Sequence, residues 1–197
     1  MKRAKEFWPV WLVSSIAAMW RLYLSTRYAG WEESDYGNLA MVRGVWDSGF
    51  THFDMNHMPG YYAVAAAFLA FTDNTVIAAK GASMLGGVAS AGLATLIMQR
   101  MAGVVPALLC GLLLVFQPEF ALYASSSLRE PLYAAFLLSV LICLLEGRPG
   151  LGGLFGALAF SVRFEAPLAL ALLGALLWFS KGRKACFRFA APVLAAM

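Results

Sequence analysis

The chain has little charge and few cysteines. Asp, Glu, Lys and Arg make up 13% of its 197 residues, whereas an ordinary globular chain has about 25%. Hydrophobic residues make up 61%, and the mean hydropathy is +0.70. Apolar runs of membrane-spanning length recur from one end to the other. This composition excludes an ordinary water-soluble domain and predicts an all-α fold, a polytopic bundle of membrane helices.

The three cysteines exclude a disulfide framework and a cysteine-rich metal site. Cys110, Cys143 and Cys186 lie within or beside apolar segments, none lies in a predicted outer loop, and their spacing matches no metal-binding motif. We therefore interpret them as packing residues. The net charge of +4 is explained by basic cytoplasmic loops, so it predicts no nucleic-acid partner.

The first apolar segment, from Phe7 to about Tyr28, predicts a retained membrane helix. It is too long for a signal peptide and no small-residue cleavage site follows it. Basic residues precede it, which predicts a cytoplasmic N-terminus, and Arg21 near its outer end is expected to snorkel or to face a polar cavity. Residues 29–75 then form the first outer loop, in which residues 36–47 have the pattern of an amphipathic helix.

Charge distribution decides whether residues 61–72 cross the membrane. Twelve helical residues cover only about 18 Å of a roughly 30 Å core. If they do not cross, nine basic and two acidic residues fall on the cytoplasmic side, against three basic and eight acidic residues outside. We therefore predict a half-length or interfacial helix at 61–72. Later apolar segments, at 76–98, 104–117, 131–145, 151–162 and 164–180, bring the total to about six spans.

The chain is expected to be a single transmembrane domain over residues 1–197. Apolar residues continue up to Met197, which suggests the N-terminal module of a longer protein. Where the last two apolar segments meet, Arg163 and Glu165 cannot face lipid, and Pro167 removes a backbone donor. We predict that two helices meet there, in a break buried in protein or lining a wet cavity.

Four polar features fall on the outer side under this topology. They are Glu32-Glu33-Ser34-Asp35-Tyr36, the stretch from His52 to Tyr62, the stretch from Ser125 to Pro131, and Arg163-Phe164-Glu165. Membrane segments separate each from the next, so the helix bundle has to gather them. Carboxylates that deprotonate and arginines that bind an anion suit the transfer of a group from a phosphate-bearing donor.

Each feature also has an interpretation without chemistry. The acids at 32–35 could form a hydrated cap on the first helix. His57, with His52 and Asp54, could hold a metal or belong to an ordinary loop. Glu130 precedes Pro131, where a carboxylate favours a helix N-terminus.

The same holds for the basic residues. Arg163 and Glu165 could be a buried packing pair, and Lys80 could only snorkel.

The ordered set resembles the polyprenyl-phosphate-sugar-dependent glycosyltransferases of the GT-C superfamily, nearest to the protein O-mannosyltransferase and aminoarabinose-transferase-like group. The resemblance covers nearly the whole chain. The matching features are an acidic pair after the first membrane helix, the segment Asn56-His57-Met58-Pro59-Gly60-Tyr61-Tyr62, an acid at the head of a helix in Leu128-Arg129-Glu130-Pro131, and Arg163-Phe164-Glu165-Ala166-Pro167. Phe164 stands where the group usually has proline.

The resemblance implies an inverting sugar transfer on the outer face of the plasma or inner membrane, from a polyprenyl-phosphate sugar to a hydroxyl of a glycan, lipid or protein. It implies that Glu33, then Glu32, with Asp35 as a rival, is the base. Glu130 and His57 would orient the acceptor or a divalent cation. The lipid phosphate would be held by Arg129, Arg163 and Lys80. The alternatives are a non-enzymatic membrane scaffold or transporter, and another lipid-phosphate enzyme, such as an O-antigen ligase-like protein.

Overall fold

The computed structural model describes residues 7–27, 33–49 and 58–196, and this part of the chain is helical without strands. The prediction of an all-α fold is confirmed. The helices are α2 (Trp8–Arg27), α3 (Glu33–Ser48), α4 (Pro59–Phe68), α5 (Thr75–Ala102), α6 (Val104–Phe116), α7 (Pro118–Tyr123), α8 (Glu130–Leu145), α9 (Pro149–Val162), α10 (Ala166–Lys181) and α11 (Arg183–Ala195). All three cysteines are free thiols.

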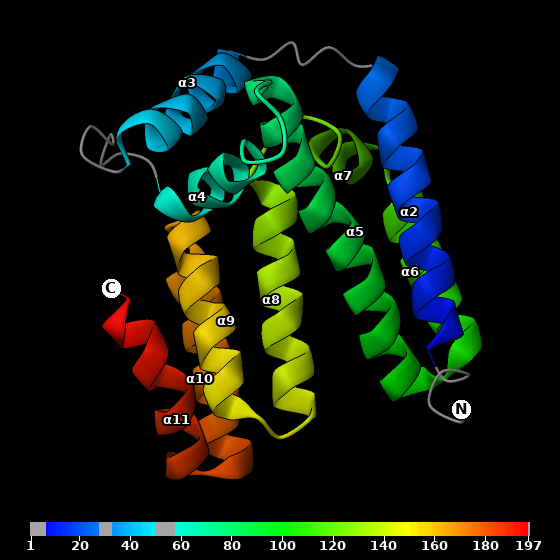
Figure 1. Cartoon of the computed structure of the whole chain (residues 1–197). Coiled ribbons are helices and arrows are strands. Elements are labelled where there is room, and N and C mark those ends of the chain that lie inside the picture. The colour runs from blue at the N-terminus through cyan, green and yellow to red at the C-terminus, as the bar shows by residue number, and fades with distance from the viewer. Residues whose placement is uncertain (1–6, 28–32, 50–57, 197) are drawn as a thin grey trace.

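The longer helices run side by side, and shorter ones lie across one end of the bundle (Figure 1). We call this the cap end; it carries α3, α4, α7 and the α9–α10 junction. The opposite, basal end carries the start of α2 and the turns α5–α6, α8–α9 and α10–α11. Successive long helices therefore alternate in direction between the two ends.

Helix α5 is the centre of the bundle and packs against α2, α4, α6 and α8. Gly86 lets α5 and α8 approach each other closely. A Cβ added there would lie 2.4 Å from the backbone nitrogen of Leu132, in the first turn of α8. No side chain fits into such a gap, so glycine lets the two backbones meet. This contact fixes where α8 begins relative to α5, and hence where Glu130 lies.

Helix α4 confirms that the predicted helix at 61–72 is short, although it begins two residues earlier and ends four residues earlier than predicted. It has 10 residues, begins with Pro59 in its first turn, and lies across the cap end (Figure 1). A Cβ on Gly60 would lie 2.3 Å from the Oγ of Ser161, so α4 rests directly on the end of α9. Asn74 then caps α5 by accepting hydrogen bonds from the backbone nitrogens of Val76 and Ile77. The predicted amphipathic helix at 36–47 lies within α3.

The predicted break after α9 is present, but it is not buried, because Phe164 is 69% exposed and Glu165 is exposed as well. Helix α9 ends at Val162, the backbone of Arg163 is extended, and α10 begins at Ala166. Pro167, in the first turn of α10, needs no backbone donor at that position. The interruption places the charged pair of the break at the cap end instead of inside an apolar helix.

Within the described residues, α5 alone is long and apolar enough to cross a membrane by length and composition. The apolar helices α6, α8, α9 and α10 are shorter. Much of the outer surface is nonetheless apolar. Exposed fractions reach 72% for Leu113, 74% for Leu168 and 86% for Phe179. Large apolar side chains are thus exposed on α6, α10 and other long helices of the bundle.

Candidate functional site at the cap end

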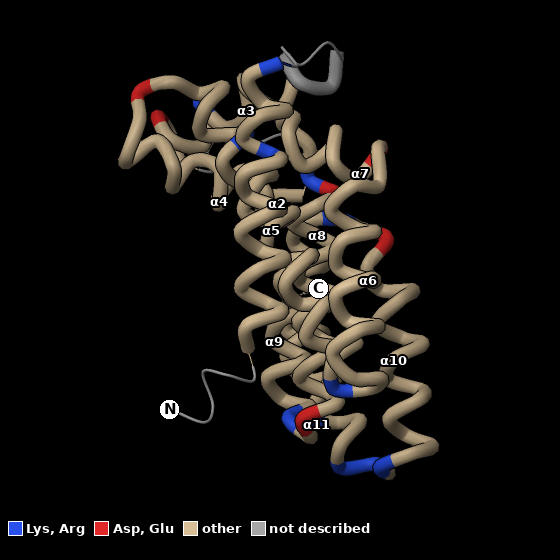
Figure 2. Tube along the Cα trace, turned by 90° about the vertical axis from the view of Figure 1, so that its right-hand side faces the viewer, with Lys and Arg blue, Asp and Glu red and all other residues tan. Residues whose placement is uncertain are grey.

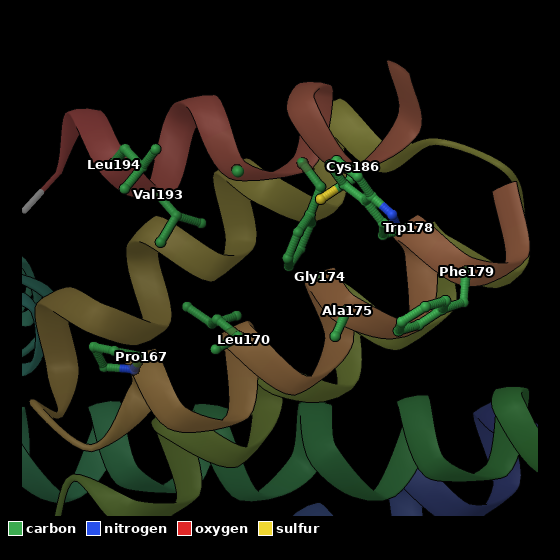
Figure 3. Close-up of a pocket in the computed structure, with 12 residues that line it drawn as sticks. Pro167, Leu170, Gly174, Ala175, Trp178, Phe179, Cys186, Val193 and Leu194 are labelled. Atoms are coloured by element: carbon green, nitrogen blue, oxygen red, sulfur yellow. The ribbon is translucent and has the colours of Figure 1, made fainter. Parts of the chain in front are cut away.

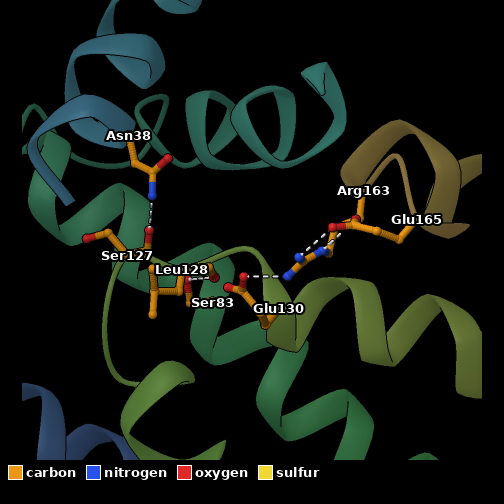
Figure 4. Close-up of polar contacts among 7 residues, drawn as sticks. All are labelled: Asn38, Ser83, Ser127, Leu128, Glu130, Arg163 and Glu165. Atoms are coloured by element: carbon orange, nitrogen blue, oxygen red, sulfur yellow. Dashed lines mark hydrogen bonds and ion pairs between the residues drawn. The ribbon is translucent and has the colours of Figure 1, made fainter. Parts of the chain in front are cut away.

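The guanidinium of Arg163 joins two carboxylates at the cap end (Figure 4). Its Nη1 donates to Glu130 Oε1 at 2.5 Å. Its Nε and Nη2 donate to the two oxygens of Glu165 at 3.0 and 2.9 Å. Arg163 and Glu130 are both about two-thirds buried. The structure therefore brings together two residues that lie 33 positions apart and that the sequence analysis placed in separate features.

Local backbone structure explains this geometry. Glu130 opens α8 directly before Pro131, where its carboxylate also faces the positive end of the helix dipole. Arg163 and Glu165 lie two residues apart in the short break before α10, so their side chains form a fork-to-fork pair. The guanidinium also lies over the ring of Tyr133, 6.0 Å from its centroid. Sequence-local features thus place each partner, and the packing of α8 against α9 brings them into contact.

The charges of Arg163 and Glu165 are firmly held in their ionised forms. The hydrogen bonds from Arg163 lower the pKa of Glu165 to about 2, and the charge of nearby Arg129 acts in the same direction. The same hydrogen bonds raise the pKa of Arg163 above its ordinary value, although burial opposes this. Glu165 therefore remains a carboxylate throughout the physiological range.

Glu130 has one oxygen that the described residues leave unused. Its Oε1 accepts from Arg163, whereas its Oε2 is buried and has no hydrogen-bond partner in residues 7–27, 33–49 and 58–196. A buried acceptor without a donor costs about 1–3 kcal/mol. A hydroxyl group or a cation brought by a ligand would remove this cost. Glu130 is therefore the described carboxylate best prepared to bind a ligand atom.

A set of buried hydrogen bonds holds the loop that leads into Glu130. Asn38 Nδ2 donates to the backbone oxygen of Ser127 at 2.9 Å, and Tyr62 Oη donates to Asn38 Oδ1 at 2.7 Å. From α5, Ser83 Oγ donates to the backbone oxygen of Leu128 at 2.6 Å (Figure 4). The sequence analysis missed Asn38 and Ser83 because a single amide or hydroxyl in a helix has no recognisable signal.

Arg21 was expected to snorkel or to face a polar cavity, and the first of these expectations is wrong. It does not snorkel to the surface: its side chain is fully buried, with the guanidinium 5.6 Å from the centroid of the Phe120 ring. A Cβ on Gly87 would lie 2.5 Å from Arg21 Nε, so the glycine makes room for it. Nη1 donates weakly to the oxygen of Ala17 at 3.5 Å, and Nε and Nη2 have no hydrogen-bond partner among the described residues. The bundle thus contains a buried cation with two unused donors.

The other predicted site residues fall into two groups. Lys80 is half-buried and donates to the backbone oxygen of Ser25 at 3.1 Å, which ties α5 to α2. Arg129 is half-buried beside Glu130. Glu33 and Asp35 lie in the first turn of α3, and nothing is described of their side chains. Glu32 and His57 lie outside the described residues.

No group of three or more His, Cys, Asp or Glu side chains in residues 7–27, 33–49 and 58–196 could hold a metal ion. Comparison of the chain with protein-family models, with characterised proteins and with solved structures finds no match. The interpretation of this site therefore depends on its residues and their geometry.

Removing the Arg163 guanidinium should release Glu165. We expect the Arg163→Gln variant to raise the pKa of Glu165 from about 2 toward its ordinary value of 4.5, because both hydrogen bonds to the carboxylate are lost. The measurement is a pH titration of glutamate side-chain carbons by NMR, with Glu165→Gln to assign the resonance. Since folding lowers this pKa, its stabilising effect is complete above pH 4.5 and fades as the pH falls toward 2.

Arg43→Gln is the matched control, because it breaks an exposed pair with Asp47 and should leave Glu165 unchanged. A wild-type Glu165 that titrates near 4.5 would contradict the described pair.

Proposed function

We propose that the protein is a polytopic membrane protein with its cap end on the non-cytoplasmic side. The apolar outer surface supports this placement, and so does the distribution of charge (Figure 2). Six basic residues gather at the basal end, namely Arg100, Arg148, Lys181, Arg183, Lys184 and Arg188. Among the described residues there, Glu146 is the single acid. Cytoplasmic loops carry such an excess of lysine and arginine.

In this placement α2, α5, α6, α8, α9 and α10 are the spans, and α3, α4 and α7 lie at the outer interface. The shorter spans have 13 to 16 residues and rise about 20–24 Å. Local thinning of the bilayer would account for the remaining distance across a roughly 30 Å core.

The activity we propose is transfer of a sugar from a polyprenyl-phosphate donor to an acceptor hydroxyl, with inversion. A first-loop carboxylate, Glu33 before Glu32 and Asp35, takes the hydroxyl proton. The acceptor oxygen bonds to the anomeric carbon as the bond from that carbon to the phosphate oxygen breaks. The lipid phosphate leaves with the electron pair of that bond. This proposal carries over what the GT-C resemblance implies.

The unused Oε2 of the buried Glu130 is the observation that best supports this activity. It can accept a hydrogen bond from an acceptor hydroxyl or help to bind a divalent cation, a role that the GT-C resemblance also gives to His57. The departing phosphate gains negative charge, which Arg129, Lys80 and Arg163 would stabilise. The Nε, Nη1 and Nη2 atoms of Arg163 all donate to carboxylates. A phosphate would therefore have to displace one of them, and we propose that it displaces Glu165, which is more exposed than Glu130.

A transporter or a non-enzymatic scaffold is the second candidate. The observation that favours it is Arg21, whose unused donors lie inside the bundle and could serve a passing anion. A transporter would retain its function when the carboxylates at the cap end are neutralised, whereas a transferase would not.

The membrane placement predicts which side each loop occupies. A reporter fused at Asp73, before α5, should lie outside, and one fused at Arg100, near the end of α5, should lie in the cytoplasm. If α4 crossed the membrane, the two reporters would lie on the opposite sides. The measurement is a paired alkaline phosphatase and green fluorescent protein fusion at each position, and exchanged sides would disprove the proposed topology.

Neutralising the proposed carboxylates should abolish sugar transfer. The variants Glu33→Gln, Asp35→Asn and Glu130→Gln are made singly. We expect the variant that lacks the base to transfer sugar about 10²- to 10⁴-fold more slowly than the wild type. The measurement is release of labelled sugar from a polyprenyl-phosphate donor by the full-length protein in proteoliposomes. Asp47→Asn is the matched control, because that acid is exposed and pairs only with Arg43 among the described residues.

Full activity in all three variants would show that the site is assigned wrongly. No release from any polyprenyl-phosphate sugar by the wild-type protein would disprove the transferase itself.

A further inference from the structure

An apolar groove runs along the side of the bundle between α10 and α11 (Figure 3). Its volume is about 510 Å³, and its lining is almost entirely apolar. Leu170 and Val193 form its walls, while Gly174 and Ala175 contribute little or no side chain and leave it open. None of the ionisable residues of the cap end lines it, so the groove is separate from the site described above.

A basic pocket adjoins the basal end of this groove. It shares Trp178, Cys186 and Ala190 with the groove and adds three exposed cations, listed here as Arg183, Lys184 and Arg188. The sequence has no acid between residues 166 and 197 that could neutralise them.

The position of these cations is unfavourable for the helix itself. Arg183 and Lys184 occupy the first turn of α11, at the positive end of the helix dipole, and Gly182 provides no side-chain cap. The guanidinium of Arg183 lies over the ring of Trp178, 5.2 Å from its centroid. A bound anion would balance the three charges and also the dipole.

We propose that this groove binds an anionic phospholipid of the cytoplasmic leaflet. One acyl chain lies between α10 and α11, and the phosphate binds Arg183, Lys184 and Arg188. From Pro167 to Phe179 helix α10 rises about 18 Å, which leaves room beside it for one acyl chain of a leaflet roughly 15 Å deep. Basic pockets between membrane helices on the cytoplasmic side recognise lipid headgroups in this way. The inference rests on the proposed membrane placement and not on the transfer reaction.

The test compares binding of phosphatidylglycerol and phosphatidylcholine with identical acyl chains, titrated onto the detergent-solubilised full-length protein and read by native mass spectrometry. We expect phosphatidylglycerol to bind at least tenfold more tightly. Each of Arg183→Gln, Lys184→Gln and Arg188→Gln should weaken it by about fivefold. Arg148→Gln, at the same end of the bundle but outside the pocket, is the matched control and should change nothing.

A second variant tests the groove separately from the charges. Ala175 is exposed on the groove side, so Ala175→Trp should fill the groove without disturbing the core and weaken both lipids. Leu172→Trp, on the same helix but outside the lining, should bind like the wild type.

Equal binding of the two lipids by the wild type would overturn the proposal. A preference for phosphatidylglycerol that survives when all three cations are replaced by glutamine would also overturn it. So would a dimer of the wild type that disappears in Ala175→Trp, because a second copy of the chain would then occupy the groove. Separately, alkaline carbonate extraction reports on the membrane placement: release of the protein would disprove that placement, whereas retention with no lipid preference would disprove only the lipid site.

Discussion

The ionic contact of Arg163 with Glu130 and Glu165 is the interaction on which the cap end depends. A charged group in a largely apolar bundle is costly unless it is paired and hydrogen-bonded. The guanidinium meets this requirement by using its donors on two carboxylates, one at the start of α8 and one just before α10. The contact therefore joins two helix ends and orients the carboxylate of Glu130. Without it, that carboxylate would have no hydrogen-bond partner among the described residues.

Close backbone packing makes this contact available. Gly86 lets α5 meet the first turn of α8, and Ser83, one turn earlier, holds the loop before Glu130 through the backbone oxygen of Leu128. From the other side, Asn38 in α3 binds the same loop. The position of α3 matters for the proposed reaction, because the proposed bases Glu33 and Asp35 lie in its first turn. The same hydrogen bonds that fix the loop thus connect the helix of the proposed base to the helix of Glu130.

Features that depend on neighbouring residues in the chain could be predicted from the sequence. Pro167 and the charges before it predicted the break between α9 and α10, and the length of the apolar run predicted the short α4. Burial of Arg21 could not be predicted, because it requires both the missing side chain of Gly87 and the position of Phe120 in α7. The roles of Asn38 and Ser83 likewise follow from backbone oxygens that only the folded loop places within reach.

A double-mutant cycle on Glu130 and Arg163 measures the central contact most directly. The unfolding free energies of the wild type, Glu130→Gln, Arg163→Gln and the double variant at pH 7 yield the coupling energy between the two side chains. For a half-buried, hydrogen-bonded ion pair we predict a coupling of about 1–3 kcal/mol, against about 0.3–0.5 kcal/mol for the exposed pair Arg43–Asp47. Additive effects of the two substitutions would show that Arg163 does not hold Glu130 at the cap end.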